Sequence, residues 1–330
     1  METAAADSRW VKLLLSSVLC FVVAANAAAK ESWFTPASGN TEVRSVYWRP
    51  ALSLLLPGFD QYLEGHTTSG VVYSSIGVGS LLLTRDSVKR LNDEKDMHEY
   101  DRWTDDQKNN YMTHGELPRQ TFLSAQYYQS AGFMSAWHSF RTSVTTQKPL
   151  GRYEFLKTEE TPKDLLAAPF KFSYLERKTT WIPLLIAAAW GANHIHSTND
   201  KVQRDPFNSS DAFYSGAISY NAGVSEEAFF RGYLQPLTME AWQSPFWANI
   251  AQSAVFALAH GTDRPPLVQA GMGYYLGWLQ QRSDWTLSEG IFVHAWWDVI
   301  VLSSAYMVRL KDHESRPSPA LWLPPFTVIW

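Results

Sequence analysis

Charged residues are bunched along this chain, and long, nearly uncharged blocks separate them. Several blocks approach the roughly 20 residues that a membrane-spanning helix needs. They cover residues 67–84, 120–140, 179–198, 212–225, 241–262, 265–281 and 290–308. The stretches between them at 85–119 and 141–178 hold too many charged side chains to enter hydrocarbon. The pattern predicts an all-α fold, a polytopic membrane helical bundle with polar extramembrane loops.

This pattern divides the chain into segments. We expect a membrane hairpin-like segment at 49–84, polar loops at 85–178, a membrane core at 179–310 and a C-terminal tail at 311–330. The block 120–140 interrupts the polar loops, which are both rich in Lys and Arg and should therefore share one side of the membrane. Either the block is an interfacial helix with Phe122, Tyr127, Phe133 and Trp137 toward lipid, or it spans and the first loop is translocated.

The N-terminal residues 1–27 have the form of a signal peptide. Arg9 and Lys12 precede the apolar run 13–23, and Ala25 and Ala27 form a small-x-small pattern. The alternative is an uncleaved N-terminal anchor, because 13–29 holds 17 residues without a charge, just enough to cross a bilayer.

A short motif begins the hairpin-like segment. Pro57, Gly58, Gln61 and Gly65 follow the pattern P-G-x-x-Q-x-x-x-G, which resembles a short bacterial membrane hairpin. Its physical content is a Pro-Gly break between two apolar half-segments. An ordinary helix start in a protein core is the alternative.

Composition excludes one class of function and leaves others open. Hydrophobic residues make up 45% of the 330 residues, and the net charge is -4. Binding of nucleic acid would need a concentrated basic face, which this balance does not supply. The single cysteine, Cys20, leaves the remaining chain without an internal disulfide.

Two adjacent glutamates lie between apolar blocks at 212–225 and 241–262. If the segment is helical, Glu227 and Arg231 are i,i+4 with the acid on the N-terminal side, the orientation that pairs best. Glu226 lies about 100° round the helix and is free to meet another group. Ionisable groups in such apolar surroundings are rare unless they face a cavity and have a function.

Two further ionisable sites lie in equally apolar surroundings. Phe256 precedes His260 by one helical turn, and His294 and Asp298 are i,i+4 on one helix face. Each of these groups alone is more often a satisfied core residue. Together on three successive apolar segments they indicate one site, because each would separately carry a burial penalty.

Such a set favours hydrolysis. A buried carboxylate can act as a general base on water, and a histidine beside it can share the proton or orient the water. A second histidine can donate to the oxyanion formed when water attacks a peptide carbonyl. A zinc site with Glu226, His260 and His294 as ligands is the alternative, since two histidines and a glutamate leave a fourth position open for water.

The ordered motifs E-E-x-x-x-R, F-x-x-x-H and H-x-x-x-N/D resemble those of the CPBP family of intramembrane proteases. This family includes the type II CAAX prenyl proteases and the bacteriocin-immunity Abi-like proteins. The match covers about residues 212–308, near a third of the chain. The chain departs from the prenyl-protease branch at Asp298, where asparagine is usual, and an ionised aspartate cannot donate to an oxyanion.

The resemblance implies an intramembrane endopeptidase core at 179–310. Glu226 and His260 would activate water, and His294 with Asp298 would support the oxyanion, with Glu227, Arg231 and Phe256 in supporting positions. It implies hydrolysis of a membrane-associated protein or peptide, and we expect the protein in the bacterial cytoplasmic (inner) membrane, in contact with membrane lipid. The family is commonly described as metalloproteases, but water activated by a glutamate needs no metal, so we expect no cofactor and keep zinc as the alternative. A non-catalytic immunity or scaffold protein of the same fold is the alternative from another class. A transporter ranks last, because the chain lacks inverted repeats.

Overall fold

The computed structural model describes residues 43–196, 202–204, 206–261 and 266–310. The expected signal peptide or anchor at 1–27 and the tail at 311–330 lie outside these residues. The α-helices are α2 (Trp48–Leu55), α3 (Phe59–Leu63), α4 (Thr67–Met97), α5 (Asp105–His114), α6 (Glu116–Gln147), α7 (Pro162–Ala167), α8 (Lys178–His196), α9 (Ser209–Glu226), α10 (Gln235–Trp242), α11 (Pro245–Ala259), α12 (Leu267–Arg282) and α13 (Ser288–Tyr306). The chain is therefore mostly helical, and the all-α part of the sequence prediction is confirmed.

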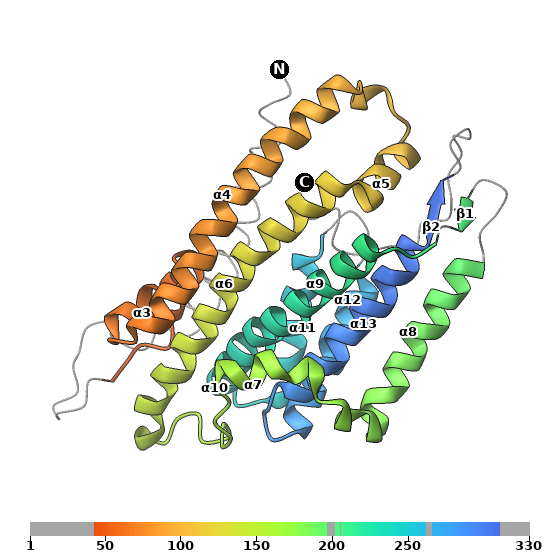
Figure 1. Ribbon diagram of the computed structural model, residues 1–330. Coiled ribbons are helices and arrows are strands. Elements are labelled where there is room, and N and C mark those ends of the chain that lie inside the picture. Colours follow the sequence, from red (N-terminus) through yellow and green to blue (C-terminus); the bar gives the residue numbers. More distant parts are fainter. Residues whose placement is uncertain (1–42, 197–201, 205, 262–265, 311–330) are drawn as a thin grey trace.

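Shorter elements connect these helices. They are the 3-10 helices η1 (Tyr100–Arg102), η2 (Lys148–Leu150), η3 (Ala168–Phe170) and η4 (Phe172–Glu176), the π-helix η5 (Glu227–Leu234), and the strands β1 (Val202–Arg204) and β2 (Val308–Leu310). The two strands pair antiparallel, with Gln203 opposite Arg309. This small ribbon joins the end of α8 to the end of α13 (Figure 1).

Among the described residues, no helix combines the length and the apolar character needed to cross a membrane. The sequence prediction of membrane-spanning helices is therefore not met in that part of the chain. The longest helices, α4 and α6, show the physical reason, because Ser, Thr, Gln and charged residues alternate with their apolar residues.

The helical structure is interrupted at Pro57 and Gly58, between α2 and α3, where the sequence predicts an interruption. Gly58 has a φ of 91°, a conformation that suits glycine, and a Cβ there would lie 2.4 Å from the Gly70 carbonyl oxygen. The Gly58 amide donates to Ser135 Oγ at 2.9 Å, and Ser135 donates to Gln61 Oε1 at 2.7 Å. The motif residues Gly58 and Gln61 thus attach the α2–α3 segment to α6.

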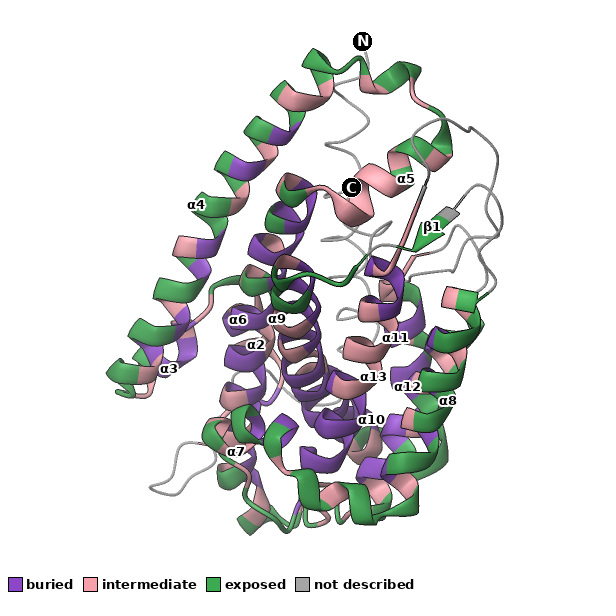
Figure 2. Ribbon diagram, turned by 45° about the vertical axis from the view of Figure 1, so that its right-hand side comes forward, coloured by how far each residue is buried: buried purple, intermediate pink, exposed green. Residues whose placement is uncertain are grey.

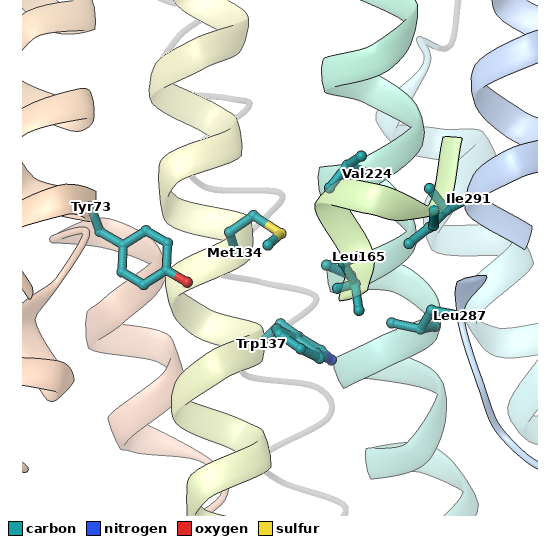
Figure 3. Packing of buried hydrophobic residues seen from close by; sticks show 9 residues of the cluster. Tyr73, Met134, Trp137, Leu165, Val224, Leu287 and Ile291 are labelled. Carbon is teal, nitrogen blue, oxygen red and sulfur yellow. The ribbon is translucent and has the colours of Figure 1, made fainter. Parts of the chain in front are cut away.

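The middle of the molecule is built around α6 and α9. Buried residues gather there and on α10, whereas α4 and α8 at the sides are largely exposed (Figure 2). The interfacial alternative for 120–140 places Phe122 and Trp137 toward lipid, but both are buried within α6, whereas Tyr127 is exposed. Figure 3 shows Trp137 beside Leu165 and Leu287, in a cluster that joins α6 to α7 and α13.

The polar region 85–178 is folded rather than extended. Its first part continues α4 and forms α5, and its second part contains α7 and the short helices η3 and η4. Capping boxes at Thr104 and Thr161 begin α5 and α7, which satisfies backbone amides that would otherwise lack partners.

Candidate functional site

The sequence-predicted residues come together from four elements, α9, η5, α11 and α13. Glu226 is the last residue of α9, and Glu227 begins the π-helix η5, which also holds Arg231. The other residues are Phe256 and His260 at the end of α11, and His294 and Asp298 in α13. π-Helical insertions in α-helices are frequent at functional sites, and here an eight-residue π-helix begins at the second of the two glutamates.

The closed end of this site is a buried ion pair. Arg231 donates to Oε1 of Glu227 at 2.9 Å, as the i,i+4 spacing predicts, and also donates to the Gly273 carbonyl at 3.2 Å. The same Glu227 oxygen lies 2.7 Å from Nδ1 of His294. The sequence does not indicate this second contact, because the two residues are 67 positions apart and no local spacing links them.

The part of the site away from the ion pair is formed by Glu226, His260 and His294. Oε2 of Glu226 lies 3.8 Å from Nε2 of His260 and 3.9 Å from Nε2 of His294, and it has no hydrogen-bond partner among the described residues. These separations are too long for direct hydrogen bonds. A water molecule that bridges the three atoms would satisfy the carboxylate, because a buried polar atom without a partner is costly.

Both histidine rings are oriented by their other nitrogen. Nδ1 of His260 lies 2.7 Å from the Phe256 carbonyl oxygen, and Nδ1 of His294 lies 2.7 Å from Glu227. When Nδ1 donates to an oxygen, Nε2 is the nitrogen available to a substrate or water. Both Nε2 atoms consequently face Glu226.

Asp298 stands beside His294 on the next turn of α13. Its Oδ2 lies 3.5 Å from Nε2 of His294. His294 therefore has Glu227 at one nitrogen and Asp298 near the other. Two carboxylates around one imidazole favour its charged form, since opposite charges within about 4–6 Å stabilise each other.

Phe256 packs against three of the polar groups. Its ring centroid is 4.4 Å from that of His260 and 6.0 Å from that of His294, and the Arg231 guanidinium lies 4.3 Å from it. An aromatic face attracts a cation, so the ring both excludes water and supports the buried arginine. This gives the phenylalanine of the second sequence motif a physical role.

Exposure increases steadily from one end of the site to the other. The exposed side-chain fractions are 0% for Arg231, 1% for Glu227 and 6% for His294, then 15% for both Glu226 and His260 and 29% for Asp298. The site therefore opens at Asp298 and is sealed at Arg231.

Small residues bring the site helices close together. A Cβ on Gly223 would lie 2.8 Å from Ala295, so α9 and α13 touch one turn from Glu226 and beside His294. A Cβ on Gly277 would lie 2.0 Å from Asn249 Oδ1. Gly273 and Gly277 have the spacing of a GxxxG motif, which permits close helix approach, and α12 packs against α11 at these two positions.

Buried glutamines fasten α12 to the helices around it. Gln252 donates to the Gly273 carbonyl at 2.9 Å, Gln235 to the Gly277 carbonyl at 3.1 Å, and Gln280 to the Arg231 carbonyl at 2.7 Å. Sequence analysis missed these residues, since a glutamine in an apolar block carries no signal of its partner.

A second group that sequence analysis missed holds the beginning of α13. Glu160 accepts from the amide of Leu287 at 2.9 Å and from the hydroxyl of Ser288 at 3.1 Å. Glu289 is buried and accepts from Thr180 at 3.1 Å, and it is paired with Arg177. A carboxylate at a helix N-terminus is favourable, and Glu160 thereby fixes the helix that carries His294.

The atoms of the residues considered as zinc ligands lie somewhat farther apart than the ligand atoms of a tetrahedral zinc site. Zinc holds nitrogen and oxygen ligands at about 2.0–2.2 Å, which sets its ligand atoms about 3.3–3.6 Å apart in a tetrahedron. The separations of 3.8 and 3.9 Å around Glu226 are wider. Within the part of the chain that the structure describes, no group of three His, Cys, Asp or Glu residues is placed to hold a metal ion.

Comparison with known families supports the resemblance seen in the sequence. Residues 208–300 match the family model described as type II CAAX prenyl endopeptidase Rce1-like. The matched segment contains every residue of the site, from Glu226 to Asp298. Neither the curated proteins nor the solved structures give a match to this chain.

Proposed function

We propose that this protein is an endopeptidase of the CPBP and CAAX protease type, because residues 208–300 match the type II CAAX prenyl endopeptidase Rce1-like model. It hydrolyses a peptide bond in a membrane-associated protein or peptide. The observation that carries this proposal is the buried Glu226 oxygen without a hydrogen-bond partner, which faces Nε2 of both His260 and His294.

Glu226 is the general base. A water held between its Oε2 and Nε2 of His260 loses a proton to the carboxylate as its oxygen attacks the peptide carbonyl carbon. The carbonyl oxygen becomes an oxyanion, and the proton taken by Glu226 is then passed to the leaving amine as the carbon–nitrogen bond breaks. A positioned general base contributes typically about 10²–10⁴-fold to such a rate.

His294 stabilises the oxyanion. Glu227 and Asp298 flank its ring and favour the imidazolium, whose Nε2–H donates into the site. Asp298 replaces the usual asparagine and acts through His294, since an ionised aspartate cannot itself donate a hydrogen bond. A well-placed oxyanion donor contributes about 2.7–4 kcal/mol.

We propose that this chemistry proceeds without a metal. The ligand atoms around Glu226 are more widely spaced than a zinc ion would set them, and they suit a water molecule. Peptidase activity should therefore survive treatment with a strong chelator. Loss of activity on chelation, restored by added zinc, would establish the zinc-dependent alternative instead.

We further propose that the protein works in a membrane, with the bacterial inner membrane as the expected one. Large apolar side chains are exposed on several helices, including Val72 and Leu82 on α4, Leu185 and Ile186 on α8, Trp247 and Leu258 on α11, and Val268 and Trp278 on α12. Extensive exposed apolar surface is typical of proteins that contact lipid. Resistance of the protein to alkaline extraction from membranes tests this placement.

Cleavage of a membrane-peptide library, including prenylated peptides, tests the enzyme assignment. The purified wild type should cleave, and Glu226→Gln and His260→Ala should lose at least about 100-fold in rate. Glu159→Gln and His98→Ala make the same chemical changes at exposed positions and should cleave like the wild type. Equal cleavage by all variants would rule out this site, and no cleavage by any folded protein would favour a non-catalytic immunity or scaffold protein.

A further inference from the structure

A cavity of about 620 Å³ lies apart from the proposed catalytic residues, between the beginning of α8 and the end of α12. The beginning of α8, which contributes to the lining, is the lower end of this helix in Figure 1. Its lining includes Arg177, Lys178, Thr179, Arg282, Ser283 and Thr286. The cavity therefore presents cationic and hydroxyl groups.

The residues that line this cavity carry a net positive charge. Glu289 in its wall is buried and already neutralised by Arg177, with Thr180 donating to it. Lys178 and Arg282 form no ion pair with any residue that the structure describes, and Asp284 is the one remaining acid of the lining. The first turn of α8 adds the partial positive charge of a helix N-terminus at Lys178. An anion is the complementary ligand.

Apolar surface begins directly beside these cations. Trp181 and Leu185 are exposed on α8 one and two turns after Lys178, and Trp278 is exposed on α12 one turn before Arg282. The Arg282 guanidinium lies 5.4 Å from the Trp278 ring centroid. Tyr275 donates to the Thr179 carbonyl and so ties the two helices together at the cavity.

A ligand that matches both features has an anionic head and an apolar tail. Basic pockets between helices at a membrane surface bind the headgroups of anionic lipids, and tryptophans there lie at the level of the headgroups. A cavity of 620 Å³ has room for a phosphate and its glycerol or a larger substituent. A free phosphate would use the cations and leave the flanking tryptophans uncovered.

We propose that this cavity binds the phosphate headgroup of an anionic phospholipid, with Lys178 and Arg282 contacting the phosphate and the acyl chains lying along the exposed faces of α8 and α12. This site is separate from peptide hydrolysis, and lipid binding can be measured on a catalytically inactive protein. Its success or failure is thus distinguishable from that of the proposed peptidase.

The test is a binding titration of the full-length protein in detergent with short-chain phosphatidylglycerol, phosphatidylcholine, glycerol 3-phosphate and inorganic phosphate. Phosphatidylglycerol should bind about ten-fold or more tightly than phosphatidylcholine. The double variant Lys178→Ala/Arg282→Ala should lose this preference. Lys89→Ala/Arg90→Ala removes two exposed cations from α4, away from the cavity, and should retain it.

Three results would overturn the lipid site. Equal binding of both lipids by the wild type would exclude headgroup recognition. An equal loss in both double variants would show only an effect of net charge. Binding of inorganic phosphate or glycerol 3-phosphate as tightly as phosphatidylglycerol would identify a site for a soluble anion instead.

Discussion

The Oε1 atom of Glu227 accepts hydrogen bonds from Nδ1 of His294 and from Arg231, at 2.7 and 2.9 Å. One carboxylate oxygen thus joins an arginine on its own helix to a histidine on α13. The two adjacent glutamates consequently differ in kind. Glu227 orients His294 through a hydrogen bond, whereas Glu226 faces Nε2 of both His260 and His294.

Glu227→Gln should destabilise the protein strongly. Removing one partner of a buried ion pair leaves the other charge uncompensated and costs about 3–5 kcal/mol, and Arg231 has no exposure to water. Chemical unfolding should show this loss. The double variant Glu227→Gln/Arg231→Met removes both charges and should recover most of it, and a double variant as unstable as the single one would contradict the pairing.

Glu226→Gln should reduce peptidase activity while changing the stability of the protein only slightly. Its Oε2 has no hydrogen-bond partner among the described residues, so its charge supports no contact that the fold requires. The free energy of unfolding should change far less than in Glu227→Gln, while peptidase activity falls by at least about 100-fold. Unfolding and rate measurements on the same preparations check this, and matching stability losses at the two positions would mean that both glutamates are structural.

Gly277→Ala should destabilise the contact between α11 and α12. The added Cβ would lie 2.0 Å from Asn249 and 2.5 Å from Gln252, an overlap of the kind that costs about 1–3 kcal/mol. Gly271→Ala in the same helix meets nothing within 4 Å and should raise stability by about 0.5–1 kcal/mol. Thermal unfolding of the two variants separates packing from helix propensity, and a similar effect at both positions would argue against the close helix approach.

Stability should fall in mild acid because of His114, which lies in the polar helix α5 and contacts the Val308 carbonyl at 2.9 Å. Burial lowers the pKa of His114 from 6.5 to about 4, and repulsion from Arg309 adds to this shift. As the pH falls, His114 is therefore protonated near pH 6.5 in the unfolded chain but only near pH 4 in the folded chain. The free energy of unfolding is consequently unaffected by His114 above pH 6.5 and decreases as the pH falls from 6.5 toward 4.

Unfolding measured against pH should give a shallower acid slope for His114→Gln than for the wild type. The exposed His98→Gln is the matched control and should keep the wild-type slope. Equal slopes for all three proteins would show that His114 does not control this loss.

Local spacing in the sequence predicts part of the site correctly. The i,i+4 rule gives the pairing of Glu227 with Arg231, because both residues lie on one helix and neighbour each other there. The ordered motifs on three apolar segments identify the residues that meet. The contact of Glu227 with His294 depends on how α9 and α13 cross at Gly223, and no single segment encodes that crossing.

The fold is predicted less completely than the site. Apolar blocks indicate helices, and the Pro57–Gly58 break is found at its expected place. The same blocks do not say what each helix faces. Trp137 and Phe122 look like lipid-facing aromatics in the sequence, but α4, α9 and η5 cover α6 and bury them. Glu160 shows the same limit, since its role depends on an amide 127 residues away.

The π-helix at Glu227–Leu234 has a consequence for the phase of the helix that contains it. The chain runs helically from Ser209 to Trp242, yet an α-helix turns about 100° per residue and a π-helix turns less. The side chains of α10 therefore point in directions rotated about the helix axis from those they would have if α9 continued as one uninterrupted α-helix. Deleting one residue from this segment would turn Gln235 and Leu237 away from the partners they now face, even though every side chain of the site remained in the sequence.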